Sequence, residues 1–286
     1  MTPDRASPSP TAATPRRVDL TRATFLIPLK FDSLERVRNL LVALRVLTRY
    51  ADTAIRLVET GRRPSFEPHL RGLGRAVRYA FLPDDAPFFH RTRLLNRMVL
   101  EAATPVVVVC DADVACHPAN LRRAMRLAEG EADVVLPYDG RFLDVPEPLI
   151  PRLLGDPRRF PGEKECRLLY PDGTGGMVFF KKACLLAAGL YNERFKSWGH
   201  EDRELLHRLA VFGHPVRRVA GPMLHLHHPR FADSHPMKNP HFAANCREYD
   251  RIRALAPEAL AAEAAAFPWL AETNPPLFPE NGAPCP

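Results

Sequence analysis

Runs of apolar residues alternate with helix-like patterns along the first 140 residues of the chain. Mostly apolar stretches of strand length lie at 23–29, 55–59, 77–82, 105–110 and 133–137. Apolar residues recur with the spacing of an amphipathic helix at 33–50, 91–103 and 118–129. Because strands and helices alternate, the pattern predicts βαβ units, and hence an α/β fold with a mixed, mostly parallel sheet flanked by helices.

The alternation stops at residues 141–172, which are rich in proline and charge and have no clean period. A long irregular segment inside a compact domain is often functional, so we predict a flexible loop there. The pattern then resumes with a strand at 177–180, helices at 183–188 and 202–212, and short strands at 216–219 and 223–225. Residues 1–22, rich in Pro, Ser, Thr and Ala, are predicted to be disordered, and 246–286 should hold one helix, at 257–267, and a tail.

The composition of the 286 residues is ordinary for a globular protein, with 46% hydrophobic and 26% charged residues, and the length allows one large α/β domain or two small ones. The formal net charge of +7 favours anionic binding partners, such as nucleotide phosphates, acidic glycans, an anionic membrane surface or nucleic acid. The arginine pairs are scattered along the chain, which indicates a solvated surface for most of them.

The six cysteines show neither a CxxC pair nor a regular spacing. This argues against a zinc site or a disulfide framework and favours a reducing compartment. No run of about 18 apolar residues occurs, so no transmembrane helix is predicted. The N-terminus lacks the apolar stretch of a secretory signal. We therefore expect a cytoplasmic protein, or one held peripherally at the inner face of the membrane.

Two carboxylates, Asp111 and Asp113, directly follow the apolar strand at 105–110. The carboxyl ends of parallel strands form the ligand-binding edge of an open α/β sheet. Carboxylate oxygens suit Mg²⁺ or Mn²⁺ that bridges a diphosphate, and such a metal would offset charge on a departing nucleotide. Aspartate also caps turns, and the pair alone leaves that alternative open.

Three histidines, His225, His227 and His228, lie within the stretch 221–230, read GPMLHLHHPR. Imidazole binds transition metals alongside carboxylates. His225 and His227 are two residues apart, so on a strand they would share a face, and an imidazole from this stretch could complete a metal site with Asp113. Each histidine taken singly could also be a surface residue or a hydrogen-bonded one.

The stretch 173–202 begins with glycines, passes through an apolar run and ends on a Trp-Gly-His-Glu-Asp cluster. Its last residue, Asp202, falls in the first turn of a predicted helix, where the dipole favours the ionised form that a general base needs. Glu201 beside it could accept hydrogen bonds from the hydroxyls of a bound sugar. The alternative for both is that they are simple N-terminal helix carboxylates.

Other residues of the same region suit contact with a sugar or a nucleotide. Trp198 offers a flat face for a sugar ring, and Gly199 leaves space beside it. Gly175 and Gly176 would let the backbone approach a ligand closely. Upstream, residues 88–96 place aromatic and guanidinium groups at a helix start, where they could stack on a base or bind phosphate. Such a patch also occurs in RNA-binding proteins, but this one is short and isolated.

In this order, the motifs resemble those of the metal-dependent GT-A glycosyltransferases, above all the β-1,4-galactosyltransferase-type branch and the related family 2 enzymes that build polysaccharides. The resemblance covers about residues 23–230. It rests on IPLK at 27–30, FHRTRLLN at 89–96, VVVVCDAD at 106–113 and the stretch 173–202. It implies a GT-A, Rossmann-like fold in a single domain.

The resemblance also implies roles for the matching positions. Contacts with the nucleotide and the donor sugar would come from Pro28, Lys30, Phe89, Arg91, Asp111, Asp113, Gly175 and Gly176. The acceptor would lie against Trp198, Gly199, His200 and Glu201. The metal, Mn²⁺ or Mg²⁺, would be bound by Asp113 and by His225, or alternatively by His227. The catalytic carboxylates would be Asp202, as the general base, and Glu201. His200 stands where many relatives carry glycine, a departure that concerns the acceptor pocket.

From this resemblance we expect an inverting transferase that moves a hexose or N-acetylhexosamine from a UDP-sugar to a hydroxyl of a glycan or glycoconjugate. Its domain would span 23–245, with a nucleotide-binding half at 23–140, the loop 141–172 closing over the donor, and an acceptor and catalytic half at 173–245. The alternative is a non-catalytic module of the same fold that binds a nucleotide sugar or a glycan. Nucleic acid is not an expected partner, whereas peripheral contact with an anionic membrane fits the net charge.

Overall fold

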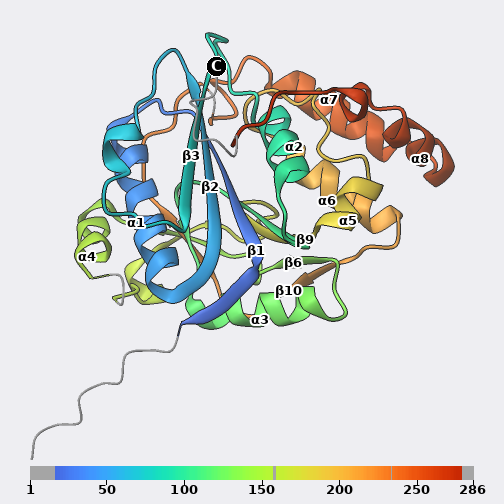
Figure 1. Cartoon of the computed structure of the whole chain (residues 1–286). Helices are drawn as coiled ribbons and strands as arrows, with labels where there is room; N and C mark the ends of the chain where they lie inside the picture. Colours follow the sequence, from blue (N-terminus) through green and yellow to red (C-terminus); the bar gives the residue numbers. More distant parts are fainter. Residues whose placement is uncertain (1–16, 157–158, 233, 279–286) are drawn as a thin grey trace, which may run out of the picture.

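The main sheet of the protein has seven strands in the order β10-β6-β9-β4-β1-β2-β3 (Figure 1). The computed structural model describes residues 17–156, 159–232 and 234–278. β9 runs antiparallel to β4 and β6, and the other neighbours in the sheet are parallel. The predicted α/β fold with a mixed, mostly parallel sheet is therefore confirmed. The strands are β1 (Val18–Leu29), β2 (Ala51–Gly61), β3 (Val77–Pro83), β4 (Val106–Cys110), β6 (Val134–Leu136), β9 (Met177–Lys181) and β10 (Val216–Arg218).

Helices flank this sheet, with α1 on one side of β1–β3 and α2 on the other in Figure 1. α1 begins where the side chain of Ser33 accepts a hydrogen bond from the backbone N–H of Arg36, and α3 begins with Pro118 at its first position. The helices are α1 (Leu34–Tyr50), α2 (Arg91–Glu101), α3 (Pro118–Glu129), α4 (Ile150–Gly155), α5 (Lys182–Ala187), α6 (Glu201–Val211), α7 (Phe242–Arg253) and α8 (Pro257–Ala265). Among the described residues, no helix has the length and apolar character needed to cross a membrane.

A second, smaller sheet has four strands in the order β5-β11-β7-β8. The strands are β5 (Val114–Ala115), β7 (Phe142–Val145), β8 (Arg167–Tyr170) and β11 (Met223–Leu226). The sheet packs against the face of α1 that carries Val42 and Val46, while Leu40 and Leu44 of the same helix belong to the core of the main sheet. α1 is thus buried between the two sheets.

The second sheet corrects the prediction of an irregular loop at 141–172. The described part of that segment supplies β7, α4 and β8, and all four residues of β7 are buried. The strand is only four residues long and is followed by prolines, so it shows no readable period. β7 pairs with β8 on one side and with β11 on the other, and His225 of β11 lies opposite Asp144 in the parallel register. Residues 157–158 lie outside the described residues.

Two other boundaries differ from the sequence prediction. β1 begins at Val18, inside the segment 1–22 that was predicted to be disordered, and residues 1–16 lie outside the described part of the chain. α8 matches the helix predicted at 257–267. α7 was not predicted, and it crosses the proposed domain end at residue 245.

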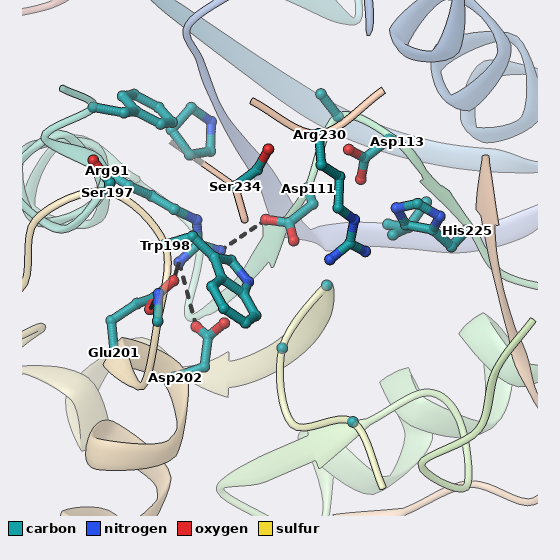
Figure 2. A pocket seen from close by; sticks show the side chains of 18 of the residues that line it. Arg91, Asp111, Asp113, Ser197, Trp198, Glu201, Asp202, His225, Arg230 and Ser234 are labelled. Atoms are coloured by element: carbon teal, nitrogen blue, oxygen red, sulfur yellow. Dashed lines mark hydrogen bonds and ion pairs between the residues drawn. The ribbon is translucent and has the colours of Figure 1, made fainter. Parts of the chain in front are cut away.

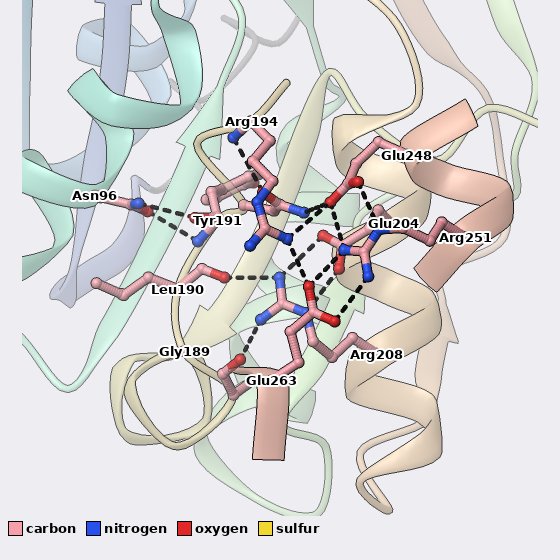
Figure 3. Close-up of polar contacts among 12 residues, drawn as sticks. Asn96, Gly189, Leu190, Tyr191, Arg194, Glu204, Arg208, Glu248, Arg251 and Glu263 are labelled. Atoms are coloured by element: carbon pink, nitrogen blue, oxygen red, sulfur yellow. Dashed lines mark hydrogen bonds and ion pairs between the residues drawn. The ribbon is translucent and has the colours of Figure 1, made fainter. Parts of the chain in front are cut away.

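A network of ion pairs holds α6, α7 and α8 against the segment that leads to the Trp-Gly motif (Figure 3). Arg208 and Glu204 lie on α6 with fully buried side chains, joined by hydrogen bonds of 2.8 and 2.9 Å. Arg208 also donates to the carbonyls of Ala188 and Leu190, which precede the motif. A second group, nearer the surface, ties α7 to α8: Glu248 and Glu263 each pair with Arg194 and Arg251.

Candidate active site

A cavity of about 350 Å³ opens at the carboxyl ends of β1 and β4. This is a usual place and an adequate size for a small-molecule site. β9 is antiparallel, so its amino end reaches the same edge, and the backbone N–H of Asp111 donates to the carbonyl of Gly176 over 2.7 Å. The sequence-predicted residues that line the cavity are Pro28, Lys30, Phe89, Arg91, Asp111, Asp113, Gly175, Gly176, Trp198, Gly199, His200, Glu201, Asp202 and His225.

One wall of the cavity holds a cluster of metal-type ligands, formed by Asp113, His225 and His228. All three are buried, and their ligand atoms lie within 4.8 Å of one another. His228 Nε2 is 3.0 Å from Asp113 Oδ2, while its Nδ1 is 2.7 Å from the carbonyl of Pro229. If Nδ1–H donates to that carbonyl and the ring is neutral, Nε2 has no hydrogen, and its lone pair points toward the carboxylate of Asp113. The arrangement therefore needs a proton or a metal ion between the two groups.

The charge around this cluster keeps Asp113 ionised. Burial by itself would raise the pKa of Asp113, but the hydrogen bond from His228 and the nearby His225 and Arg36 lower it well below its usual range. An ionised carboxylate with two imidazoles is a donor set that suits Mn²⁺ and other borderline divalent ions. The residues present therefore fit Mn²⁺ better than Mg²⁺, the other predicted metal, which prefers oxygen ligands.

The structure separates the two histidines between which the sequence left the choice open. His225 lies in the cluster, whereas the side chain of His227 is 45% exposed and its ring faces Asp144. His228, the third histidine of the stretch considered from the sequence, joins His225 in the cluster, although His225 and His227 were preferred as ligands. It lies two residues beyond the end of β11, where the strand alternation that relates His225 to His227 no longer applies. The assignment of a metal to these residues stays a prediction.

The opposite wall carries the two carboxylates that open α6 (Figure 2). Arg91, on α2, lies between them and Asp111. Its guanidinium is 2.8 Å from Asp111, 3.3 Å from Asp202 and 3.5 Å from Glu201. Arg91 is 8% exposed, so one buried cation holds three acidic groups in place. Burial raises the pKa of Asp111 above its ordinary value, although the positive charge of Arg91 acts to lower it.

Glu201 is more enclosed than the sequence suggested. It is 4% exposed and accepts a hydrogen bond of 2.8 Å from the backbone N–H of Gly199. Burial and the neighbouring charge of Asp202 raise the pKa of Glu201 to about 7. Its proposed contact with acceptor hydroxyls stays a prediction.

Gly175 leaves the space that Asp202 occupies. A Cβ atom added to Gly175 would lie 2.1 Å from Asp202 Oδ2 and 2.9 Å from its Cγ. The carbonyl of Gly175 is itself held by the hydroxyl of Tyr138, over 2.7 Å, and by the backbone N–H of Met177. The glycine of this motif is thus required by the carboxylate that lies against it.

Aromatic rings close the cavity on the side of the Trp-Gly motif. Trp198 stacks on Phe242 with ring centroids 5.8 Å apart, and His200 lies 5.7 Å from Phe242 and 5.0 Å from Tyr249. His200 has φ of 69°, a left-handed conformation that glycine adopts without strain. Phe242, which lines the cavity, and Tyr249, which packs on His200 outside it, belong to α7, so the sequence missed both together with the helix. Only Asn245 and Ile252 of α7 are buried, too few for a readable apolar period.

Further basic side chains, Lys30 and Arg230, line the cavity. Lys30 Nζ donates to the carbonyl of Ala86 over 2.8 Å. Arg230 donates to the hydroxyl of Tyr170 over 2.6 Å, and Figure 2 shows its guanidinium between Asp111 and His225. Arg230 was not predicted, because a lone arginine after the histidine stretch carries no recognisable pattern.

Comparisons with known proteins found one matching family model and several similar solved structures. Residues 159–229 match a family model described as the N-terminal domain of galactosyltransferase. A mannosyltransferase from Pyrobaculum calidifontis, solved with GDP-Man and Mn²⁺, is similar in structure with a TM-score of 0.50 and 16% identity, over 94% of this chain and 75% of that one. The catalytic domain of Drosophila β-1,4-galactosyltransferase 7, solved with xylobiose, gives a TM-score of 0.45 and 14% identity.

The alignment with the Drosophila enzyme covers 70% of this chain and 64% of that one. Among curated proteins, none matches the sequence of this chain. The mannosyltransferase shares the fold, and the family match covers the glycines at 175 and 176, the Trp-Gly motif and the metal-type histidines. The resemblance to the GT-A glycosyltransferases that the motifs indicated is thereby confirmed.

Proposed function

We propose that the protein is a metal-dependent inverting glycosyltransferase, which moves a hexose or N-acetylhexosamine from a UDP-sugar to a hydroxyl group of a glycan. The observation that carries the proposal is that one cavity joins the cluster Asp113–His225–His228 to the carboxylate of Asp202. A site for the donor diphosphate and a base for the acceptor therefore face the same space. The structurally similar mannosyltransferase, solved with GDP-Man and Mn²⁺, supports a nucleotide-sugar donor.

On the donor side, Asp113, His225 and His228 would hold the metal. Bound there, the ion would supply Lewis-acid stabilisation of the negative charge that develops on the leaving diphosphate. Arg230 and Lys30 line the same cavity and would add positive charge for the phosphates. The missing side chain of Gly175 makes room for the carboxylate of Asp202, and that of Gly176 makes room for Met223 and Phe142, so the two glycines shape the floor on which the sugar would lie.

On the acceptor side, Asp202 would take the proton of the attacking hydroxyl. The bond from the acceptor oxygen to the anomeric carbon forms as the bond from that carbon to the phosphate oxygen breaks, on the opposite face of the sugar. Arg91 holds Asp202 and Asp111 at fixed positions, so base and donor site keep their relative geometry. The face of Trp198 would pack against a sugar ring.

A thermal-shift screen tests the nucleotide and the metal together. UDP-sugars and GDP-sugars are compared with and without Mn²⁺, and we expect the largest rise in Tm with a UDP-sugar plus Mn²⁺. A preference for GDP-sugars would refute the nucleotide assignment, and binding independent of Mn²⁺ would refute the metal.

The Asp202→Asn variant tests the base. Its turnover should fall by about 10²–10⁴-fold, the usual contribution of a general base, while the Tm shift with the nucleotide sugar persists. Turnover near that of the unmodified protein would remove Asp202 from the mechanism. A protein that binds the nucleotide sugar with Mn²⁺ but transfers and hydrolyses nothing would instead be the non-catalytic binding module.

A further inference from the structure

Asp144 lies directly behind the metal-type cluster, outside the stretch that matches the family model. β7 runs parallel to β11, and the register places Asp144 opposite His225. Asp144 is 5% exposed, and its Oδ1 is 2.9 Å from His225 Nδ1. This contact joins residues that are 81 positions apart in the chain, so the sequence gives no sign of it.

The contact decides which nitrogen of His225 can bind a metal. An ionised carboxylate only accepts hydrogen bonds, so His225 Nδ1 must carry the hydrogen. In a neutral imidazole this leaves the lone pair on Nε2, the nitrogen on the other side of the ring. His228 shows the same division of roles, with its Nδ1 on the Pro229 carbonyl and its Nε2 toward Asp113.

We propose that Asp144 is a positioning residue, which fixes the tautomer and the ring orientation of His225 so that Nε2 is presented to the metal. Carboxylates behind metal-binding histidines commonly have this role, and they raise the basicity of the ligand. The inference rests on the metal site of the proposed function. It concerns a residue that touches no substrate and no metal.

His227 has a separate role in this arrangement. Its Nδ1 is 2.9 Å from Asp144 Oδ2, so the two histidines bind the two oxygens of one carboxylate. The side chain of His227 is 45% exposed, and it lies outside the cluster. His225 and His227 were predicted to share a face of the strand. Of these two, His225 is the metal-type ligand, and His227 only helps to orient Asp144.

Titration of the full chain with Mn²⁺ alone tests the proposal, with free Mn²⁺ read from its electron paramagnetic resonance signal. The Asp144→Asn variant should bind Mn²⁺ about 10–100-fold more weakly, the usual cost of losing such a partner. His227→Ala should stay within a small factor of the unmodified protein. Asp133→Asn is the matched control, because Asp133 pairs in the same way with His214, 2.7 Å away, outside the cavity.

The outcomes separate the inference from the proposed function. If the unmodified chain binds no Mn²⁺, the metal site is wrong and the role of Asp144 is wrong with it. If the chain binds Mn²⁺ and folded Asp144→Asn binds it equally well, only the role of Asp144 is refuted.

A second measurement does not depend on the variant folding. Nitrogen NMR of the histidine rings in the metal-free chain, assigned with His225→Gln, should show the Nδ1–H tautomer for His225. The Nε2–H tautomer would overturn the proposal.

Discussion

A single methyl group at Gly175 should disable the proposed base without disturbing the fold. Alanine can occupy this position as far as the backbone is concerned, because Gly175 does not have a left-handed φ. The carbonyl of Gly175 is held by Tyr138 and by the N–H of Met177, so the backbone has little freedom to withdraw. The carboxylate of Asp202 must therefore move.

The size of that movement follows from the geometry. The added Cβ would lie 2.1 Å from Asp202 Oδ2, whereas ordinary van der Waals contact begins near 3.4 Å, so the oxygen has to shift by about 1.3 Å. A displacement of about 1 Å at a reacting group can cost on the order of 10²-fold in rate. We expect kcat of Gly175→Ala to fall by about that factor, measured as UDP released in the presence of Mn²⁺ and acceptor.

Gly155→Ala is the matched control, since no atom from elsewhere in the described residues lies within 4 Å of the position that its Cβ would take and its φ is also ordinary. Its turnover and Tm should be close to those of the unmodified protein. Gly175→Ala should keep its folded structure and its Mn²⁺ affinity, because the cluster lies on the other wall. Undiminished turnover in folded Gly175→Ala would show that Asp202 is not the base, or that it works from another position.

Two further predictions concern buried charges. Burial and Asp202 raise the pKa of Glu201 to about 7 from an ordinary 4.5, so the folded chain holds this proton more tightly than the unfolded chain, and stability falls as pH rises between these values. Glu201→Gln removes that loss, because glutamine does not titrate. Between pH 4 and pH 8, the free energy of unfolding of this variant, measured with urea, should rise by up to about 3 kcal/mol relative to that of the unmodified protein. If the unfolding free energies of the two proteins change in parallel with pH, the raised pKa of Glu201 is wrong. Arg208→Met leaves Glu204 buried without its cation and should lower the free energy of unfolding in urea by about 3–5 kcal/mol. The double variant Arg208→Met/Glu204→Leu should recover most of this loss. An equal loss in the double variant would mean that packing, not charge, dominates.

The elements that the sequence predicted well are those whose signals are local. The apolar run of β4 fixes both the strand and the edge at which Asp111 and Asp113 lie. Ser33 and Pro118 mark the starts of α1 and α3, and each start agrees with the prediction within one residue. The cavity could be anticipated because its main residues belong to motifs that follow such elements directly.

The parts that could not be predicted depend on distant contacts. β7 is a strand because β11 and β8 pair with its two edges, and α7 is held by ion pairs and aromatic stacking. His228 enters the cluster because the chain turns after β11, a direction that strand alternation does not give. In each case the deciding partner lies far away in the sequence, and no local pattern reports it.

The small sheet β5-β11-β7-β8 has a consequence for how the protein folds and opens. Its strands are two to four residues long and come from separate parts of the chain, so the entropy of closing long loops must be lost before the pairs can form. The small sheet should therefore form after the main sheet during folding, and it should be the first part to open by local unfolding. A cation shared by Asp113 and the two histidines would bind only the assembled form and would slow its opening. The ion that the proposed reaction requires would then also set the lifetime of the assembled site.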